Sequence, residues 1–170
     1  IHHLGEQIEA HLKKRKDLEI VIADERARLL DTGGGTAAVL HHFHDEPFFS
    51  VNTDALLVDS RGDAFQRLAR SWDDRHMDAL MLLALTVRAH GYTGQGDFVM
   101  DSAGRLKRRP RATVAPFVWT TVQICSPRLF ADPPPPPFST NVLWDRAIAA
   151  GRLFGQRLDG AWLEINTPAG

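Results

Sequence analysis

A carboxylate follows a short apolar run in a way that could place it at a ligand site. The run Phe48-Phe49-Ser50-Val51 leads directly into Asn52-Thr53-Asp54. A short, continuous apolar run is typical of a buried strand in a parallel sheet, and Pro47 can precede such a strand without breaking its ladder. Because open α/β sheets bind ligands at the carboxyl ends of their strands, we expect Asp54 to hold a divalent metal for phosphate chemistry.

A second carboxylate, Glu164, lies in an apolar segment near the end of the chain, before a Thr-Pro turn. Acids from distant parts of a chain can converge on one hard cation. Mg²⁺ usually takes one or two carboxylates together with substrate phosphates and waters. Transfer at phosphorus needs positioning and charge neutralisation more than a protein nucleophile. Spacing alone leaves the pair open, because acids at strand ends also serve as caps and salt-bridge partners.

A glycine-rich turn, Thr32-Gly33-Gly34-Gly35, precedes a helix-like segment at residues 37–43. Glycines before a helix let the backbone approach a ligand closely, and the helix start presents free N–H groups to an anion. The alternative is a plain turn in which Thr36 is the N-cap of the helix. The segment is not a P-loop, because no Gly-Lys-Ser/Thr follows it.

Other reactive or charged side chains fit structural roles better than chemical ones. His41, His42 and His44 could bind zinc, but neighbouring histidines on a helix point to different faces and no cysteine has metal-ligand spacing. The single cysteine, Cys125, is more typical of a small packed hydrophobe than of a nucleophile. The basic cluster at residues 107–111 suits a solvated hairpin edge better than RNA binding, so nucleic acid is not an expected partner.

Length and composition favour one soluble domain over residues 1–170, with 44% hydrophobic residues and a net charge of -1. A near-neutral charge gives no general attraction to nucleic acid or to anionic lipid. The longest apolar run, residues 79–85, is far shorter than the roughly 20 residues of a membrane helix. A lone cysteine fits a reducing compartment, and we expect a cytoplasmic protein.

Hydrophobic periodicity predicts helices that alternate with strands, the pattern of an α/β fold. Residues 77–87 form the most apolar stretch and are predicted to be a central strand, although periodicity alone does not exclude a helix. Helices are predicted at residues 4–16, 64–72 and 141–150, strands at residues 18–23 and 117–124, and hairpins at residues 98–107 and 153–165.

Taken in order, these segments resemble the sugar-1-phosphate nucleotidyltransferases, and most closely the N-acetylmuramate-1-phosphate uridylyltransferase-like branch. The resemblance covers nearly the whole chain and implies a Rossmann-like, three-layer α/β fold with a mostly parallel central sheet. The matching segments are residues 2–4, Asp24-Glu25, Leu30-Asp31-Thr32-Gly33-Gly34-Gly35, Glu46-Pro47-Phe48-Phe49, Val51-Asn52-Thr53-Asp54, Gly96-Asp97-Phe98, Val122-Gln123-Ile124, Pro127-Arg128-Leu129-Phe130 and residues 162–168.

The resemblance implies a reaction between a nucleoside triphosphate, with UTP favoured, and a sugar 1-phosphate, with release of pyrophosphate. Such an enzyme makes nucleotide sugars for the cell wall and uses Mg²⁺, here held by Asp54 and Glu164. The implied nucleotide contacts are Thr32, Gly33, Gly34 and Asn52, and the implied sugar-phosphate contacts are Gly96, Asp97, Thr121 and Asn141. Three positions depart from the family pattern: Glu164 replaces the usual Asp, while Asn166 and Thr121 replace glycines.

The family's defining element is an N-terminal Gly-rich loop with a downstream Arg and a Pro-Lys pair, and these residues contain no counterpart. The basic segment at residues 104–110 lies too late in the chain to replace it. We therefore expect that the first strand, the loop and the first helix are absent from this sequence. The 170 residues alone should be nearly inactive, because charge stabilisation at the triphosphate is lost. The alternative is a non-catalytic relative that binds a sugar nucleotide or a partner protein.

Overall fold

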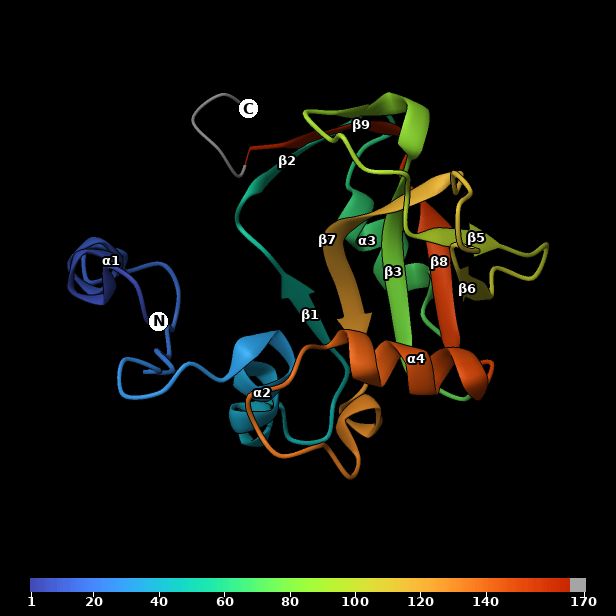
Figure 1. The fold of residues 1–170 in the computed structure, drawn as a ribbon. Helices are drawn as coiled ribbons and strands as arrows, with labels where there is room; N and C mark the ends of the chain where they lie inside the picture. The colour runs from blue at the N-terminus through green and yellow to red at the C-terminus, as the bar shows by residue number, and fades with distance from the viewer. Residues whose placement is uncertain (166–170) are drawn as a thin grey trace.

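Two β-sheets and four α-helices form the fold in the computed structural model, which describes residues 1–165 (Figure 1). The helices are α1 (Gly5–Leu12), α2 (Asp31–Ala38), α3 (Ala64–Ser71) and α4 (Asn141–Ala149), and the 3-10 turns are η1 (Leu40–Phe43), η2 (Thr86–Arg88) and η3 (Pro127–Phe130). The central sheet contains β1 (Phe48–Val51), β3 (Ala79–Leu85), β5 (Phe98–Met100), β6 (Leu106–Arg108), β7 (Phe117–Cys125) and β8 (Leu153–Arg157). The smaller sheet contains β2 (Ala55–Asp59), β4 (Ala89–His90) and β9 (Gly160–Glu164).

The central sheet is mixed, with the strand order β6-β5-β7-β3-β8 and with β1 paired to β7. Of these pairs, only β3 and β8 run parallel; β1, β3 and β5 all pair with β7 in the antiparallel sense. The predicted α/β class is confirmed, but the expectation of a mostly parallel sheet is wrong for residues 1–165. Antiparallel neighbours need no helical crossover, and β5, β6 and β7 follow one another along the chain without a helix between them.

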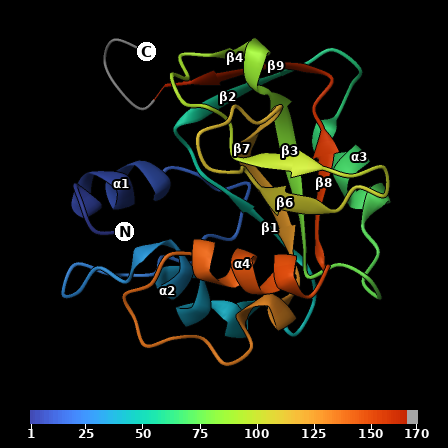
Figure 2. The same cartoon turned by 45° about the vertical axis from the view of Figure 1, so that its right-hand side comes forward.

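Helices cover both faces of the central sheet, which gives the three layers that the sequence predicted (Figure 2). Strand β3 is buried along almost its whole length, as its continuous apolar run requires. Met81 and Leu83 belong to the core that contains Leu143 and Trp144 of α4. The alternate residues of β3 belong to the opposite core, which contains Leu68 of α3. A strand whose two faces lie in separate cores is a rigid base for the loops at its ends.

The predicted strand at residues 18–23 is not formed. Leu18 and Val21 are 62% and 59% exposed, and no described strand lies beside this segment. The end of the segment is tied to the chain start, because the Ile1 amino group donates to the Ala23 carbonyl and, just beyond the segment, the Glu25 N–H donates to the Ile1 carbonyl. Apolar, β-branched residues do not make a strand without a neighbour that completes their hydrogen bonds.

The strand β1 that precedes Asp54 is present, but it lies at an edge of the sheet rather than within it. Its described partner is β7 alone, and Phe49 and Val51 are 40% and 45% exposed. The prediction of a buried, parallel strand is therefore wrong in burial and in direction, while its position along the chain is right.

Within residues 1–165, every helix is too short or too polar to span a bilayer.

The hairpin predicted at residues 153–165 is also not formed, because its two strands belong to different sheets. Strand β8 pairs with β3, whereas β9 pairs with β2 and β4. Gly160, the first residue of β9, lies tightly against β2, and a Cβ there would lie 2.0 Å from the Val58 carbonyl oxygen. This pairing brings the last described strand beside the segment that begins at Asp54. The helices at α1, α3 and α4, the β5–β6 hairpin and the central strands β3 and β7 are confirmed.

Candidate functional site

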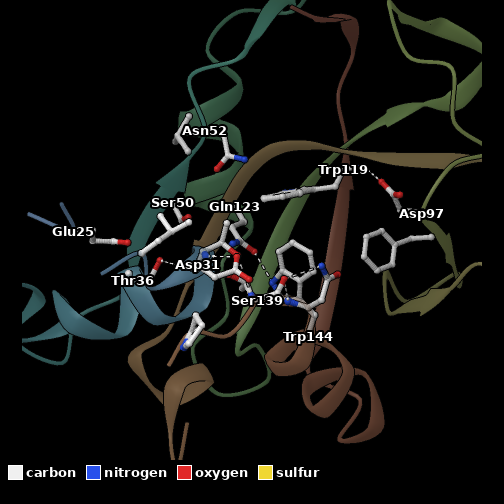
Figure 3. A pocket seen from close by; sticks show the side chains of 18 of the residues that line it. Glu25, Asp31, Thr36, Ser50, Asn52, Asp97, Trp119, Gln123, Ser139 and Trp144 are labelled. Atoms are coloured by element: carbon white, nitrogen blue, oxygen red, sulfur yellow. Dashed lines mark hydrogen bonds between the residues drawn. The ribbon is translucent and has the colours of Figure 1, made fainter. Parts of the chain in front are cut away.

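A cleft of about 1070 Å³ opens between α2, the end of β1, the β5–β7 region and the start of α4 (Figure 3). Segments that are far apart in the sequence meet there because β1, β5 and β3 all pair with β7. Four predicted site residues line the cleft: Thr32, Asn52, Asp97 and Asn141. The residues that the sequence reasoning did not assign include Glu25, Asp31, Ser50, Arg108, Trp119, Gln123, Ser139 and Trp144.

The wall formed by α2 differs from the predicted glycine turn. The helix begins at Asp31, so Gly33 and Gly34 lie within it, and their N–H groups donate to the Phe138 carbonyl at 3.0 and 3.1 Å. A Cβ at Gly33 would lie 2.5 Å from the Phe138 ring. These glycines are buried and allow close packing of the helix; they present no free N–H to a ligand. Thr36 is not an N-cap either, because it lies in the last half of the helix.

Thr32 and Gly35 are the parts of this motif that reach the cleft. The hydroxyl oxygen of Thr32 accepts a hydrogen bond from the Thr140 N–H at 3.1 Å, which ties α2 to the segment before α4. The Glu25 carboxylate lies over Gly35, where a Cβ would be 2.5 Å from Oε1, and its other oxygen accepts the Leu30 N–H at 2.8 Å. The hydrogen bond from Leu30 holds Glu25 in the cleft wall, and the lack of a side chain at Gly35 leaves room for its carboxylate.

Asn52 is fixed where β1 ends, and its backbone N–H donates to the Thr121 carbonyl at 3.1 Å. Thr121 lies at a bulge, since the register between β3 and β7 shifts between Met81 and Leu83. Its φ of 71° is in the left-handed region, which is rare for a β-branched residue and favours glycine. Its Oγ1 is buried without a hydrogen-bond partner among the described residues. Thr121 supports Asn52 from behind and is not part of the cleft wall.

Gly96 and Asp97 lie just before β5, and Asp97 is hydrogen-bonded to β7. The Asp97 carboxylate accepts the Trp119 N–H at 2.9 Å, and its own N–H donates to the Phe117 carbonyl at 2.7 Å (Figure 3). Gly96 has a φ of 77°, and a Cβ there would lie 2.4 Å from the Ala115 carbonyl oxygen. Asp97 lines the cleft, whereas Gly96 lies behind the wall and makes the tight turn that presents Asp97.

Tyr92 buttresses this turn, and its hydroxyl oxygen accepts the Gly96 N–H at 3.1 Å. Burial raises the pKa of the Tyr92 phenol, and the negative charges of Asp97 and Glu164 raise it further. Tyr92 thus remains a neutral phenol between the turn that carries Asp97 and the strand that carries Glu164. No sequence motif indicated this role.

Two tryptophan rings, Trp119 and Trp144, line the cleft together with Asn141, the first residue of α4. The Trp119 and Trp144 rings meet edge to face at 4.7 Å between centroids, and Trp144 Nε1 donates to Gln123 Oε1 at 3.1 Å. The side-chain oxygen of Asn141 accepts a hydrogen bond from Arg108 at 2.8 Å. Flat apolar rings beside amide and guanidinium groups are the surfaces that bind polar rings such as sugars or bases.

The predicted metal acids, Asp54 and Glu164, are brought together at the backbone level. Ala55 is the register partner of Glu164, and the Asp54 carbonyl accepts the Ile165 N–H at 3.0 Å. Asp54 is exposed, Glu164 is half-buried, and neither lines the cleft, although Asn52 does so two residues before Asp54. Residues 166–168 of the predicted C-terminal motif lie outside the described residues.

The donor set at Asp54 and Glu164 fits a metal that also takes ligands from a substrate. No group of three or more His, Cys, Asp or Glu residues among residues 1–165 could form a cage, and the histidines at positions 41, 42 and 44 are included in that statement. Mg²⁺ that completes its shell with phosphates and waters needs only one or two protein carboxylates, which Asp54 and Glu164 on these paired segments would supply. Their role as ligands remains a prediction.

Comparisons with known proteins agree with the fold. No family model matches the chain. It is 36% identical over 172 residues to the N-acetylmuramate alpha-1-phosphate uridylyltransferase of Caulobacter vibrioides, with 99% of this chain and 71% of that protein covered.

Solved structures that share the fold include the following two. HddC from Yersinia pseudotuberculosis, complexed with GMP-PN, superposes with a TM-score of 0.71 at 14% identity, over 99% of this chain and 72% of that one. The inositol-1-phosphate CTP transferase from T. maritima superposes with a TM-score of 0.66 at 16% identity, over 98% and 66%. The chain therefore belongs to the sugar-1-phosphate nucleotidyltransferases, enzymes that join a nucleotidyl group to a sugar phosphate.

Proposed function

We propose that this protein transfers a uridylyl group from UTP to the 1-phosphate of an amino sugar and releases pyrophosphate. The observation that carries the proposal is the meeting of Thr32, Asn52, Asp97 and Asn141 in one cleft. The first two lie on the α2 and β1 side, where we place the nucleotide, and the last two lie on the β5 and α4 side, where we place the sugar. A cleft of about 1070 Å³ is large enough for a nucleotide sugar.

We also propose that Asp54 and Glu164 hold a Mg²⁺ ion at the edge of this cleft. The cleft is lined by the acids Glu25, Asp31 and Asp97 and by a single cation, Arg108, among the described residues. A triphosphate placed there meets little positive charge from these residues. A bound Mg²⁺ would supply that charge by neutralising phosphate oxygens as the bond at phosphorus changes.

The choice of base and sugar follows the relative from Caulobacter vibrioides, whose name specifies N-acetylmuramate 1-phosphate and uridylyl transfer. The same similarity supports a role in supplying a nucleotide sugar for the cell wall in the cytoplasm. The alternative is a non-catalytic relative that binds a sugar nucleotide in the same cleft but does not catalyse the transfer.

Pyrophosphate release tests the proposal directly. The protein translated from its complete reading frame is given N-acetylmuramate 1-phosphate, MgCl₂ and UTP, CTP, GTP or dTTP in separate assays. We expect release that is fastest with UTP and that stops when EDTA removes the metal. No release with any triphosphate and sugar 1-phosphate would refute the proposed reaction, and calorimetric binding of UDP-sugar without turnover would favour the alternative.

A further inference from the structure

Arg108 is the only Lys, Arg or His among the described residues that line the cleft, which otherwise carries acids. It lies at the end of β6, and Leu106 on the same strand is buried in the core. Alternation along the strand therefore turns Arg108 to the inner face, whereas Lys107 between them is exposed. A lone cation in an acidic cleft attracts an anionic group of the ligand more strongly than any neighbour does.

The surroundings of Arg108 hold its guanidinium in one place and leave part of it free. Nε donates to Asp145 at 2.7 Å, and Nη2 donates to the side-chain oxygen of Asn141 at 2.8 Å. The guanidinium carbon lies 5.1 Å from the centre of the Phe98 ring and 5.6 Å from that of Trp144. Nη1 donates no hydrogen bond to any described residue. Such a preoriented fork matches a carboxylate well.

The position of Arg108 separates it from the proposed metal site. Strands β1 and β5 pair with the same edge of β7, opposite β3, but at its two ends: Val51 of β1 faces Val122, and Phe98, the β5 partner of Arg108, faces Phe117. Five residues of an extended strand, at about 3.4 Å each, place roughly 17 Å along β7 between these two positions. If the 1-phosphate of the sugar binds at the proposed metal site, Arg108, which lines the cleft with Asp97 and Asn141, would face the far side of the sugar ring.

We propose that Arg108 binds a carboxylate carried by the acceptor sugar and makes the enzyme prefer acidic sugar 1-phosphates over neutral ones. Since this inference rests on the proposed function, it names the substrate class of the same cleft. The substrate in the name of the Caulobacter vibrioides relative, a muramate, is such a sugar acid. Asp145 and Asn141 are positioning residues for Arg108. The rings of Phe98 and Trp144 pack against its guanidinium group.

Two acceptors that differ by one carboxylate test the inference. N-acetylmuramate 1-phosphate carries a lactyl ether with a carboxylate, and N-acetylglucosamine 1-phosphate lacks it. With UTP and Mg²⁺, we expect Arg108→Gln to lower kcat/KM for the acidic sugar by about 10- to 100-fold, the range of a hydrogen bond to a charged group. The value for the neutral sugar should fall by a clearly smaller factor, since only the support that Arg108 gives to Asn141 is lost there. Arg108→Lys should restore part of the preference, and Lys107→Gln, which removes a charge outside the cleft, should keep all of it.

Equal losses for both sugars in Arg108→Gln, or a wild-type enzyme with no preference for the acidic sugar, would overturn the inference. Absence of turnover by the wild type would refute the proposed function instead. In that case calorimetry with N-acetylmuramate 1-phosphate decides the role of Arg108: weaker binding to Arg108→Gln and Arg108→Lys than to Lys107→Gln supports it, and equal affinities overturn it.

Discussion

Replacing Gly33 with alanine separates the packing role of the α2 glycines from the ligand-binding role that the sequence suggested. Gly33 faces Phe138, and a Cβ there would lie 2.5 and 2.6 Å from two ring carbons and 2.8 Å from the Phe138 carbonyl oxygen. The ring is buried in the core, and the carbonyl accepts the N–H groups of Gly33 and Gly34. Neither the ring nor the backbone can move away without opening the contact between α2 and the segment before α4.

The expected loss follows from three contributions. Overpacking a core by one methyl costs about 1–3 kcal/mol, and weakening the two hydrogen bonds to Phe138 adds up to about 1 kcal/mol each. Because alanine favours the helix over glycine by about 1 kcal/mol, the substitution regains that much stability. We expect Gly33→Ala to lower the free energy of unfolding by about 2 kcal/mol.

Gly35→Ala is the matched control, because it makes the same change in the same helix. Its Cβ would meet only the end of the Glu25 side chain, at 2.5 Å from Oε1. Losing the hydrogen bond from Leu30 to Glu25 costs about 1 kcal/mol, which the helix propensity of alanine offsets. Urea unfolding of both variants measures the difference. A Gly33→Ala protein as stable as the wild type, or less stability lost there than in Gly35→Ala, would refute the packing role.

Two further predictions concern residues behind the cleft. Thr121→Gly should raise the free energy of unfolding by about 1 kcal/mol, because a β-branched residue at a φ of 71° and a buried hydroxyl without a partner both cost stability. A lower midpoint of urea unfolding in that variant would contradict this. Cys125 is fully buried and burial raises its thiol pKa, so iodoacetamide at pH 8 should modify it only after unfolding. Mass spectrometry of the treated native protein checks this, and rapid alkylation would be the contrary result.

Local signals predicted the elements that depend on local chemistry. Helix α3 begins where Asp63 accepts the N–H groups of Phe65 and Gln66, and the turn between β5 and β6 is closed by Asp101 and Gly104. Long-range pairing could not be predicted in the same way. Asp159-Gly160 is a typical hairpin signal, yet β9 pairs with β2. This pairing packs the buried Trp162 of β9 beside Leu57 of β2 in the core.

In the site, too, local signals were predictable from the sequence and long-range contacts were not. Asp54 follows β1 as predicted, and its approach to Glu164 depends on the β2–β9 pairing that only the structure reveals. Glycines are poor helix formers, so the sequence does not indicate that Gly33 and Gly34 lie inside α2, where the close contact with Phe138 requires a residue without a side chain. The charge of residues 107–111 predicts a solvated hairpin edge for Arg108, whereas alternation with the buried Leu106 places Arg108 on the inner face.

The central claim is that Asp54 holds the metal that makes this cleft a nucleotidyltransferase site. The most direct measurement compares Asp54→Asn with Asp45→Asn, the same change at an exposed acid before β1. Pyrophosphate release and binding of Mn²⁺, a spectroscopic substitute for Mg²⁺, are followed in both proteins. We predict that Asp54→Asn loses activity by about 100-fold or more and binds Mn²⁺ more weakly, since metal neutralisation supplies several kcal/mol. Asp45→Asn should match the wild type. Wild-type turnover and Mn²⁺ affinity in Asp54→Asn would contradict the account.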